Sequence, residues 1–250
     1  MEFSWKGFVA GLVIAGSGIY GAVFGVGILT NIHSAYLRAL SHWTVLIHNS
    51  KGSGATGFIA RGKSNKKYII TNAHVCDLAE DGNVFVYYWG DEYRLKVVKK
   101  YPTNDLCAIE APKSAGLAVN IANNFKEGEA AYAIGHPLLE PLTVTLGELS
   151  GPVSISVLIG KNVKPEECTG ETYRFIDLSG TLMGIFGVDN VCVRDLEAEA
   201  STVSILPGNS GSAVVNTFGS VIGVAFAANE AGTRSYIVPL SDLKDFLNSL

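Results

Sequence analysis

The stretch ILPGNSGSAV, residues 205–214, combines a Pro-Gly turn, a serine between asparagine and glycine, and the start of an apolar run. Gly, Pro, Asn and Ser are frequent in surface loops, so the stretch is typical of a turn that precedes a strand. It is also typical of a loop that exposes a nucleophile, with Ser210 as the candidate. Because a serine hydroxyl is a weak nucleophile by itself, this second interpretation requires a base and an orienting acid elsewhere in the chain.

Two other residues stand where such partners would be expected. Of the five histidines, His74 directly follows an apolar run in YIITNAHVC, and a histidine at the end of a strand can stand at a barrel rim. Asp105 opens an apolar run in YPTNDLCAIEAP. Asp77 is a rival, but the residues that follow it, LAEDG, are typical of a solvated turn. The chain therefore carries a candidate base, acid and nucleophile in the order His74, Asp105, Ser210.

Composition limits the kind of protein that this can be. The chain has 250 residues, of which 48% are hydrophobic and 17% charged, enough for one mid-sized domain with a substantial core. The formal net charge is -4 and Lys and Arg form no cluster, so we expect no nucleic-acid partner. We also expect no metal and no cofactor, since no C-x-x-C pair is present.

Short runs of strand length, rich in Val, Ile, Tyr and Phe, recur from residue 43 onward, and no long segment of helical period lies between them. This predicts an all-β barrel or sandwich, with a short helix over 241–250 and an irregular insertion over 160–170. The predicted strands are 43–48, 57–61, 67–71, 83–89, 93–100, 105–111, 130–135, 142–149, 154–160, 212–217, 220–227 and 235–240.

The N-terminus differs from the rest. Residues 7–31 contain no charge, a run longer than the apolar region of a signal peptide, which is the rival interpretation. We expect a retained single-pass transmembrane helix within 1–41, followed by a domain over 42–250. The domain would then lie outside the cytoplasm, or the chain would be secreted after signal-peptide cleavage.

The motifs together resemble a known family. TNAHV, DLCAIEA and GNSGSAVVNTFGSVIGVAFA are similar to the three signature regions of the trypsin-like serine peptidases, most of all to the HtrA-type branch. YAIGHPL followed by TVTLGELSG is similar to the stretch that precedes the serine loop in that branch. The His, Asp, Ser order is the one used in chymotrypsin-like enzymes.

The resemblance implies two six-stranded Greek-key barrels, about 42–122 and about 127–240, with the C-terminal helix after them. It implies that Ser210 is the nucleophile of a serine endopeptidase acting on polypeptides, that His74 is its general base, and that Asp105 orients the imidazole. The backbone amides of Gly208 and Ser210 would form the oxyanion hole. A catalytically inactive binding or scaffold module is the alternative, and a metal-dependent or cysteine hydrolase is a distant third.

The resemblance also implies a pocket for the residue before the scissile bond. None of its expected residues is charged, so we expect cleavage after small or aliphatic residues. These pocket residues are Ser204, Ile205, Val224, Ala225, Phe226 and Ala227.

The sequence departs from the family at several positions. Ser212 replaces a second glycine, and Asn209 cannot form the ion pair through which digestive enzymes are activated. The chain stops about one short helix after the last predicted strand, so we expect no PDZ domain, and the oligomeric state stays open. Cys76 and Cys107 each follow a triad candidate by two residues, so we expect them to be close together, either as buried thiols or as a disulfide. Whether Cys168 and Cys192 pair stays open.

Overall fold

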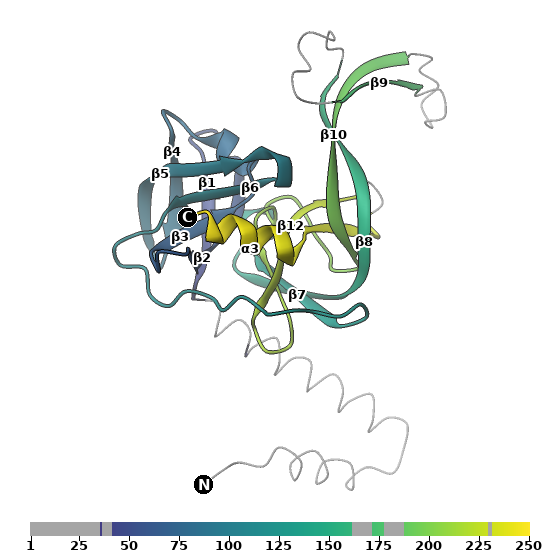
Figure 1. Ribbon diagram of the computed structural model, residues 1–250. Coiled ribbons are helices and arrows are strands. Elements are labelled where there is room, and N and C mark those ends of the chain that lie inside the picture. Colours follow the sequence, from purple (N-terminus) through teal and green to yellow (C-terminus); the bar gives the residue numbers. More distant parts are fainter. Residues whose placement is uncertain (1–35, 37–41, 162–171, 178–187, 230–231) are drawn as a thin grey trace, which may run out of the picture. The chain divides into compact units, whose positions relative to one another are not determined.

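The computed structural model describes residues 36, 42–161, 172–177, 188–229 and 232–250, and Trp43–Leu250 form one compact unit (Figure 1). For 157–161, 172–177 and 188–191 only the backbone is described. The predicted membrane helix over 7–31 lies outside these residues, as does most of the predicted insertion over 160–170. Within the described residues, no helix is long and apolar enough to cross a membrane.

The first half of the unit is a closed, antiparallel, six-stranded barrel with the strand order β1-β2-β3-β6-β5-β4. Strand β4 does not pair with β3 but crosses back to β1, and β5 and β6 then fill the ring, which is a Greek-key connection. The strands are β1 Thr44–His48, β2 Gly54–Arg61, β3 Lys67–Thr71, β4 Asn83–Tyr88, β5 Asp91–Tyr101 and β6 Leu106–Glu110.

The second half is a seven-stranded antiparallel sheet with the order β13-β12-β11-β7-β8-β10-β9. A further pairing joins β10 to β13, through Glu199–Ser201 and Ser235–Ile237, so six of these strands pair in a ring and β9 lies beyond it on β10. The strands are β7 Ala130–Gly135, β8 Thr143–Lys161, β9 Thr172–Asp177, β10 Val188–Ser201, β11 Ala213–Val215, β12 Val221–Ala228 and β13 Ser235–Val238.

The predicted strand boundaries are wrong in the middle of this half. The runs 142–149 and 154–160 are one strand, β8, which continues through Gly151 (φ 99°) and Pro152 beside an irregularity in its pairing with β10. Proline is accepted in a strand at such a bulge. Strands β9 and β10 were not predicted, although buried Leu196, Ala198 and Ala200 alternate with exposed or half-buried acidic residues along β10.

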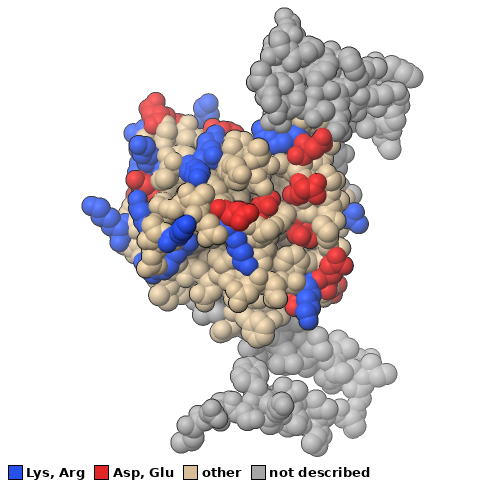
Figure 2. Space-filling model, viewed as in Figure 1, with Lys and Arg blue, Asp and Glu red and all other residues tan. Residues whose placement is uncertain are grey.

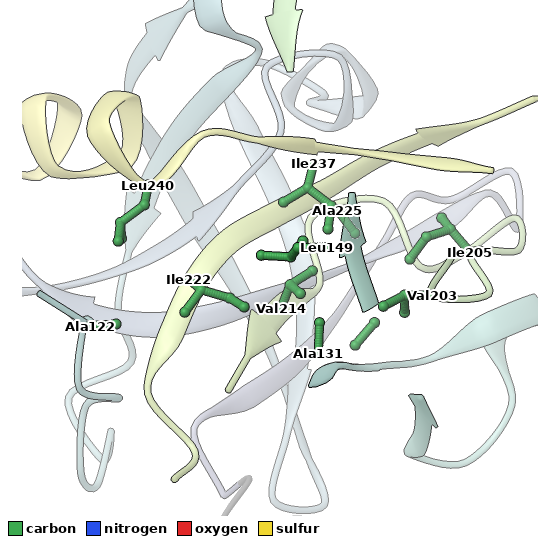
Figure 3. Packing of buried hydrophobic residues seen from close by; sticks show 11 residues of the cluster. Ala122, Ala131, Leu149, Val203, Ile205, Val214, Ile222, Ala225, Ile237 and Leu240 are labelled. Carbon is green, nitrogen blue, oxygen red and sulfur yellow. The ribbon is translucent and has the colours of Figure 1, made fainter. Parts of the chain in front are cut away.

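Both cores are built from strands that are buried over most of their length. Val45 and Ile47 of β1 are fully buried in the first barrel, as are aliphatic side chains of β2, β3, β4 and β6. The core of the second barrel is drawn in Figure 3. It contains Ala122, Ala131, Ala133, Leu149, Val203, Ile205, Val214, Ile222, Ala225, Ile237 and Leu240.

The predicted C-terminal helix is α3, Leu240–Asn248. Its apolar face buries Leu243, Phe246 and Leu247. Phe246 stacks on Tyr101 of β5 with the ring centroids 6.2 Å apart, so the last element of the chain packs on the first barrel. In this way α3 joins the two halves.

The two halves carry different charge. In the view of Figure 2, Lys and Arg gather on the side of the first barrel, whereas Asp and Glu follow the side of β8 and β10. Exposed Arg94, Lys96 and Lys100 lie on β5, and exposed Asp195 and Glu197 lie on β10.

Candidate active site

His74 lies just beyond the end of strand β3, at the rim of the first barrel. Strand β3 ends at Thr71, and a 3-10 helix, η1 (Val75–Leu78), begins directly after His74. The backbone of His74 is already helical (φ -64°, ψ -26°), and 48% of its side chain is exposed. The turn into η1 therefore presents the imidazole at the rim of the barrel.

Asp105 occupies the adjacent rim position. It follows the short 3-10 helix η2 (Pro102–Asn104), adopts a left-handed backbone (φ 49°, ψ 45°), which Asp tolerates better than most residues, and is 5% exposed. Its Oδ1 accepts a hydrogen bond from the backbone N–H of His74 at 3.0 Å, and its Oδ2 lies 2.8 Å from His74 Nδ1. Asn72 Nδ2 donates to the Asp105 carbonyl at 3.1 Å.

These contacts define the state of the imidazole. An ionised carboxylate only accepts hydrogen bonds, so Nδ1 of His74 must be the donor. In the neutral ring, Nε2 then carries the lone pair, which is the tautomer that a general base requires. The rival acid, Asp77, is not available for this task, because its carboxylate pairs with Lys100 and 66% of its side chain is exposed.

The serine loop contains a β-turn whose type is set by its sequence. Asn209 N donates to Leu206 O at 2.9 Å, so Pro207 and Gly208 occupy the two central positions. Proline at the first and a positive φ at the second, +93° for Gly208, are the features of a type II turn. A Cβ on Gly208 would lie 2.5 Å from His136 O and 2.9 Å from Leu138 N, so glycine is required for space as well as for φ.

This turn fixes the direction of the Gly208 amide. The carbonyl of Pro207 accepts a hydrogen bond from Leu138 N at 2.6 Å and therefore points toward the loop 136–140. In a trans peptide the N–H points opposite to the C=O, so the N–H of Gly208 points away from that loop. Among the described residues, the amides of Gly208 and Ser210 donate to no backbone carbonyl, so both donors are left for a ligand.

The backbone around Ser210 is tied to the first barrel. Ser210 O accepts a hydrogen bond from Thr56 N of β2 at 2.9 Å. Gly211 (φ +82°) approaches so closely that a Cβ would lie 2.1 Å from both Thr56 O and Thr71 Oγ1. Since Thr71 ends β3 three residues before His74, the structure brings the serine loop to the part of the first barrel that carries the His-Asp pair. The hydrogen bonds of the described residues include none between Ser210 Oγ and His74, and such bonds are often long in ligand-free enzymes.

Thr56 was not identified from the sequence, yet it links three segments. Its Oγ1 donates to Gly208 O at 2.8 Å and accepts from His136 N at 2.9 Å. Burial lowers the pKa of His136, and the contact of its Nδ1 with Glu140 O at 3.0 Å opposes this shift only in part. Leu138 and Leu139, which follow His136, both have a positive φ, a conformation that costs leucine about 1–2 kcal/mol. The loop 136–140 is therefore strained where it contacts the Gly208 turn.

The departure from the family at Ser212 has a structural explanation. Ser212 is fully buried, and a Cβ on Gly135 would lie 1.9 Å from Ser212 Oγ. The absence of a side chain at Gly135 therefore makes room for the serine. Asn209 is also buried, at 2% exposure, and its Oδ1 points to the same space, 2.8 Å from that Cβ position.

The residues expected to line a substrate pocket separate into two groups. Ile205 and Ala225 belong to the core of the second barrel (Figure 3), and Val224 is fully buried. Ser204 is exposed and Ala227 is half-buried. Phe226 is 6% exposed and lies at a register shift in the pairing of β12 with β13, between Ala225 and Ala227.

Cys76 and Cys107 form a disulfide with their Cα atoms 6.5 Å apart. Of the two alternatives left open by the sequence, the disulfide is therefore the one found. Cys192 is also disulfide-bonded, and Cys168 lies outside the described residues. Within the described part of the chain, no group of three or more His, Cys, Asp or Glu side chains could hold a metal ion.

Comparison with known proteins agrees with this geometry. The profile of the trypsin-like peptidase domain matches residues 55–224. The chain is 28% identical over 201 residues to serine protease Do-like HtrB of Bacillus subtilis, covering 78% of this chain and 38% of the relative. It is 27% identical over 210 residues to the HtrA-like serine protease of Staphylococcus aureus, covering 80% of this chain and 24% of the relative. The chain thus spans less than half the length of these curated relatives.

Solved structures show the same fold. The active form of the Rv3671c protease from M. tuberculosis superposes with a TM-score of 0.61 at 17% identity, covering 84% of this chain and 81% of that one. The serine endoprotease from Yersinia pestis superposes with a TM-score of 0.57 at 20% identity, covering 82% and 61%. The fold and the paired His and Asp define a chymotrypsin-like protein, and the profile match shows that the chain belongs to the trypsin-like peptidase family, with relatives named as HtrA-type proteases.

Proposed function

We propose that this chain is a serine endopeptidase in which Ser210, His74 and Asp105 form the catalytic triad. The observation that carries the proposal is the double contact of the Asp105 carboxylate with His74, at 3.0 Å to its backbone N–H and 2.8 Å to Nδ1. This contact leaves Nε2 of a half-exposed imidazole free to accept a proton, and the serine loop is hydrogen-bonded to the same end of the barrel.

In the proposed reaction, Ser210 Oγ attacks the carbonyl carbon of a peptide bond while His74 Nε2 takes its proton. The Asp105 carboxylate stabilises the imidazolium. The amides of Gly208 and Ser210 donate to the oxyanion, and each donor of this kind contributes roughly 3–4 kcal/mol to the transition state. His74 then protonates the leaving amine, and water hydrolyses the acyl-enzyme by the same route.

Cleavage after small or aliphatic residues remains part of the proposal. Of the six predicted pocket residues, Ile205 and Ala225 belong to the core cluster and Val224 is fully buried, which leaves Ser204, Phe226 and Ala227 as the ones we expect to contact a substrate side chain. None of the three carries a charge that would pair with a substrate Arg or Lys. A peptide library cleaved by the protein should give products ending in Ala, Val or Ile, and a dominant signal after Arg or Lys would contradict this pocket.

We further propose that residues 7–31 anchor the chain in a membrane with the peptidase domain outside the cytoplasm. The disulfide between Cys76 and Cys107 supports this location, because disulfides persist in oxidising compartments. Membrane fractionation of the expressed full chain tests the anchor. Recovery of a shortened chain in the medium would favour signal-peptide cleavage instead.

The decisive experiment for the activity compares the wild type with Ser210→Ala. The variant should lose about four to six decades of turnover, because the triad acts as a unit. A fluorophosphonate probe should label the wild type at Ser210 and leave the variant unlabelled. A folded wild-type protein that neither cleaves peptides nor reacts with the probe would favour the alternative, an inactive protease-fold binding module.

A further inference from the structure

The segment that carries His74 is not part of the barrel ladder. Pairing between β3 and β6 ends with Thr71 opposite Cys107, and the chain leaves the sheet from Asn72 onward. The position of His74 therefore depends on contacts other than strand pairing. Two hydrogen bonds help to hold the segment in place, one from Asn72 Nδ2 to Asp105 O and one from His74 N to Asp105 Oδ1.

The Cys76–Cys107 disulfide lies beside these hydrogen bonds and joins the same two segments. Cys76 follows His74 by two residues in η1, and Cys107 follows Asp105 by two residues in β6. Both cross-links therefore span a sequence separation of 31 residues. The cysteines are 3% and 0% exposed, and their bond is covalent, whereas water can compete for the hydrogen bonds of the half-exposed imidazole.

We propose that the Cys76–Cys107 disulfide is a positioning element for the His74–Asp105 pair. The disulfide limits the separation of η1 from the start of β6, and so holds the imidazole within hydrogen-bond reach of the carboxylate while substrate binds and leaves. Neither His74 nor Asp105 lies inside a regular strand, so hydrogen bonds alone would allow the pair to open. A displacement of about 1 Å in such a pair can cost about a hundredfold in rate.

The effect on activity rests on the proposed peptidase function, so the test includes a readout that does not. Wild type, Cys76→Ala/Cys107→Ala and Val84→Ala are compared by kcat, KM, melting temperature and the downfield proton resonance of His74 Nδ1–H. Val84 is a buried residue of β4, which lies opposite β3 in the strand order of the barrel. Val84→Ala therefore controls for destabilisation of the barrel away from the site.

We expect the cysteine pair to lose about tenfold to a hundredfold in kcat with little change in KM, and to lose or broaden the Nδ1–H resonance. Val84→Ala, assayed where it is fully folded, should keep both kcat and the resonance. If the folded cysteine pair retains kcat within about twofold and keeps the resonance, the disulfide only stabilises the fold and the proposal is overturned. If the wild type is inactive, the proposed function fails, whereas the resonance still decides the positioning role.

A second measurement applies if the cysteine pair does not fold. The wild-type chain is treated with a phosphine, which gives two electrons to each disulfide; water then supplies the oxygen of the phosphine oxide and the two protons of the thiols. Alkylation and peptide mass spectrometry then count the fraction of Cys76 that remains bonded, separately from Cys192. The resonance and the kcat of the folded fraction should fall with that fraction, and their independence from it would overturn the proposal.

Discussion

Replacing Asp105 with asparagine tests the central contact of the site with almost no change in volume. The two carboxylate oxygens have different partners, because Oδ1 accepts from the backbone N–H of His74 and Oδ2 accepts from Nδ1 of its ring. An asparagine has only one acceptor oxygen, so it can satisfy only one of the two donors.

Each orientation of the new amide has a cost. If its oxygen faces the backbone N–H, its NH₂ faces Nδ1, which must then accept, and the ring proton moves to Nε2. That tautomer cannot take a proton from Ser210. If its oxygen faces Nδ1–H, the NH₂ opposes the His74 backbone N–H at a site that is 5% exposed, and an unpaired buried donor costs about 1–3 kcal/mol. The first orientation is therefore favoured, and the same substitution in the chymotrypsin-type triad lowers kcat about 10⁴-fold.

The assay is kcat and kcat/KM on a peptide substrate, with circular dichroism to verify the fold and ¹⁵N NMR to read the tautomer of His74. Asp105→Asn should lower kcat by about three to four decades, leave KM nearly unchanged and move the ring proton to Nε2. Asp77→Asn is the matched control, because that carboxylate pairs with Lys100 at the surface. A kcat within about tenfold of the wild type would refute the reasoning about the two acceptors.

Three further outcomes follow from the structure. Gly208→Ala should lower kcat by about 10²–10³-fold at similar KM in a steady-state assay, because its Cβ would lie 2.5 Å from a carbonyl oxygen and turn the oxyanion donor away; an active variant would show that this amide is not used. Removing both Cys76 and Cys107 should reduce the free energy of unfolding by about 4 kcal/mol in chemical denaturation, as expected for the loop that this disulfide closes, and an unchanged unfolding midpoint would contradict this. Burial and then Glu127 raise the pKa of Glu199, so its ionised form destabilises the folded chain as the pH rises through its unfolded pKa. Glu199→Gln should therefore raise the free energy of unfolding at pH 7, by less than ~1 kcal/mol because the group is partly exposed. The melting temperature should rise at pH 7 and stay unchanged at pH 3.

Local sequence was sufficient for those features that depend on neighbours along the chain. Strand β3 was predicted with the bounds that the structure shows, because a run of Tyr and Ile between polar clusters satisfies the pleated, half-buried surface of a barrel. Pro207 and Gly208 specify a type II turn by their own backbone preferences. The alternation along β10 was also present in the sequence, but Gly151 and Pro152 were interpreted as a break where the structure has a bulge.

Other features required contacts between residues far apart in the chain. The sequence offered both Asp77 and Asp105 as acids, and only the pairing of β3 with β6 brings Asp105 to His74 while Asp77 turns to Lys100. The same pairing joins Cys76 to Cys107.

The turn at Pro207 and Gly208 shows the same division. Its type follows from Pro207 and Gly208, but the direction of its amide depends on Leu138, and its position on Thr56. Neither residue carries a motif, because a backbone N–H is present at every residue except proline and a buried threonine hydroxyl is common. The sequence by itself determined the residue types of the candidate site and most of the strands around them. Only the closed barrels, which bring together segments more than 100 residues apart, decided which of these residues meet, because hydrogen bonds and disulfides form only over a few ångströms.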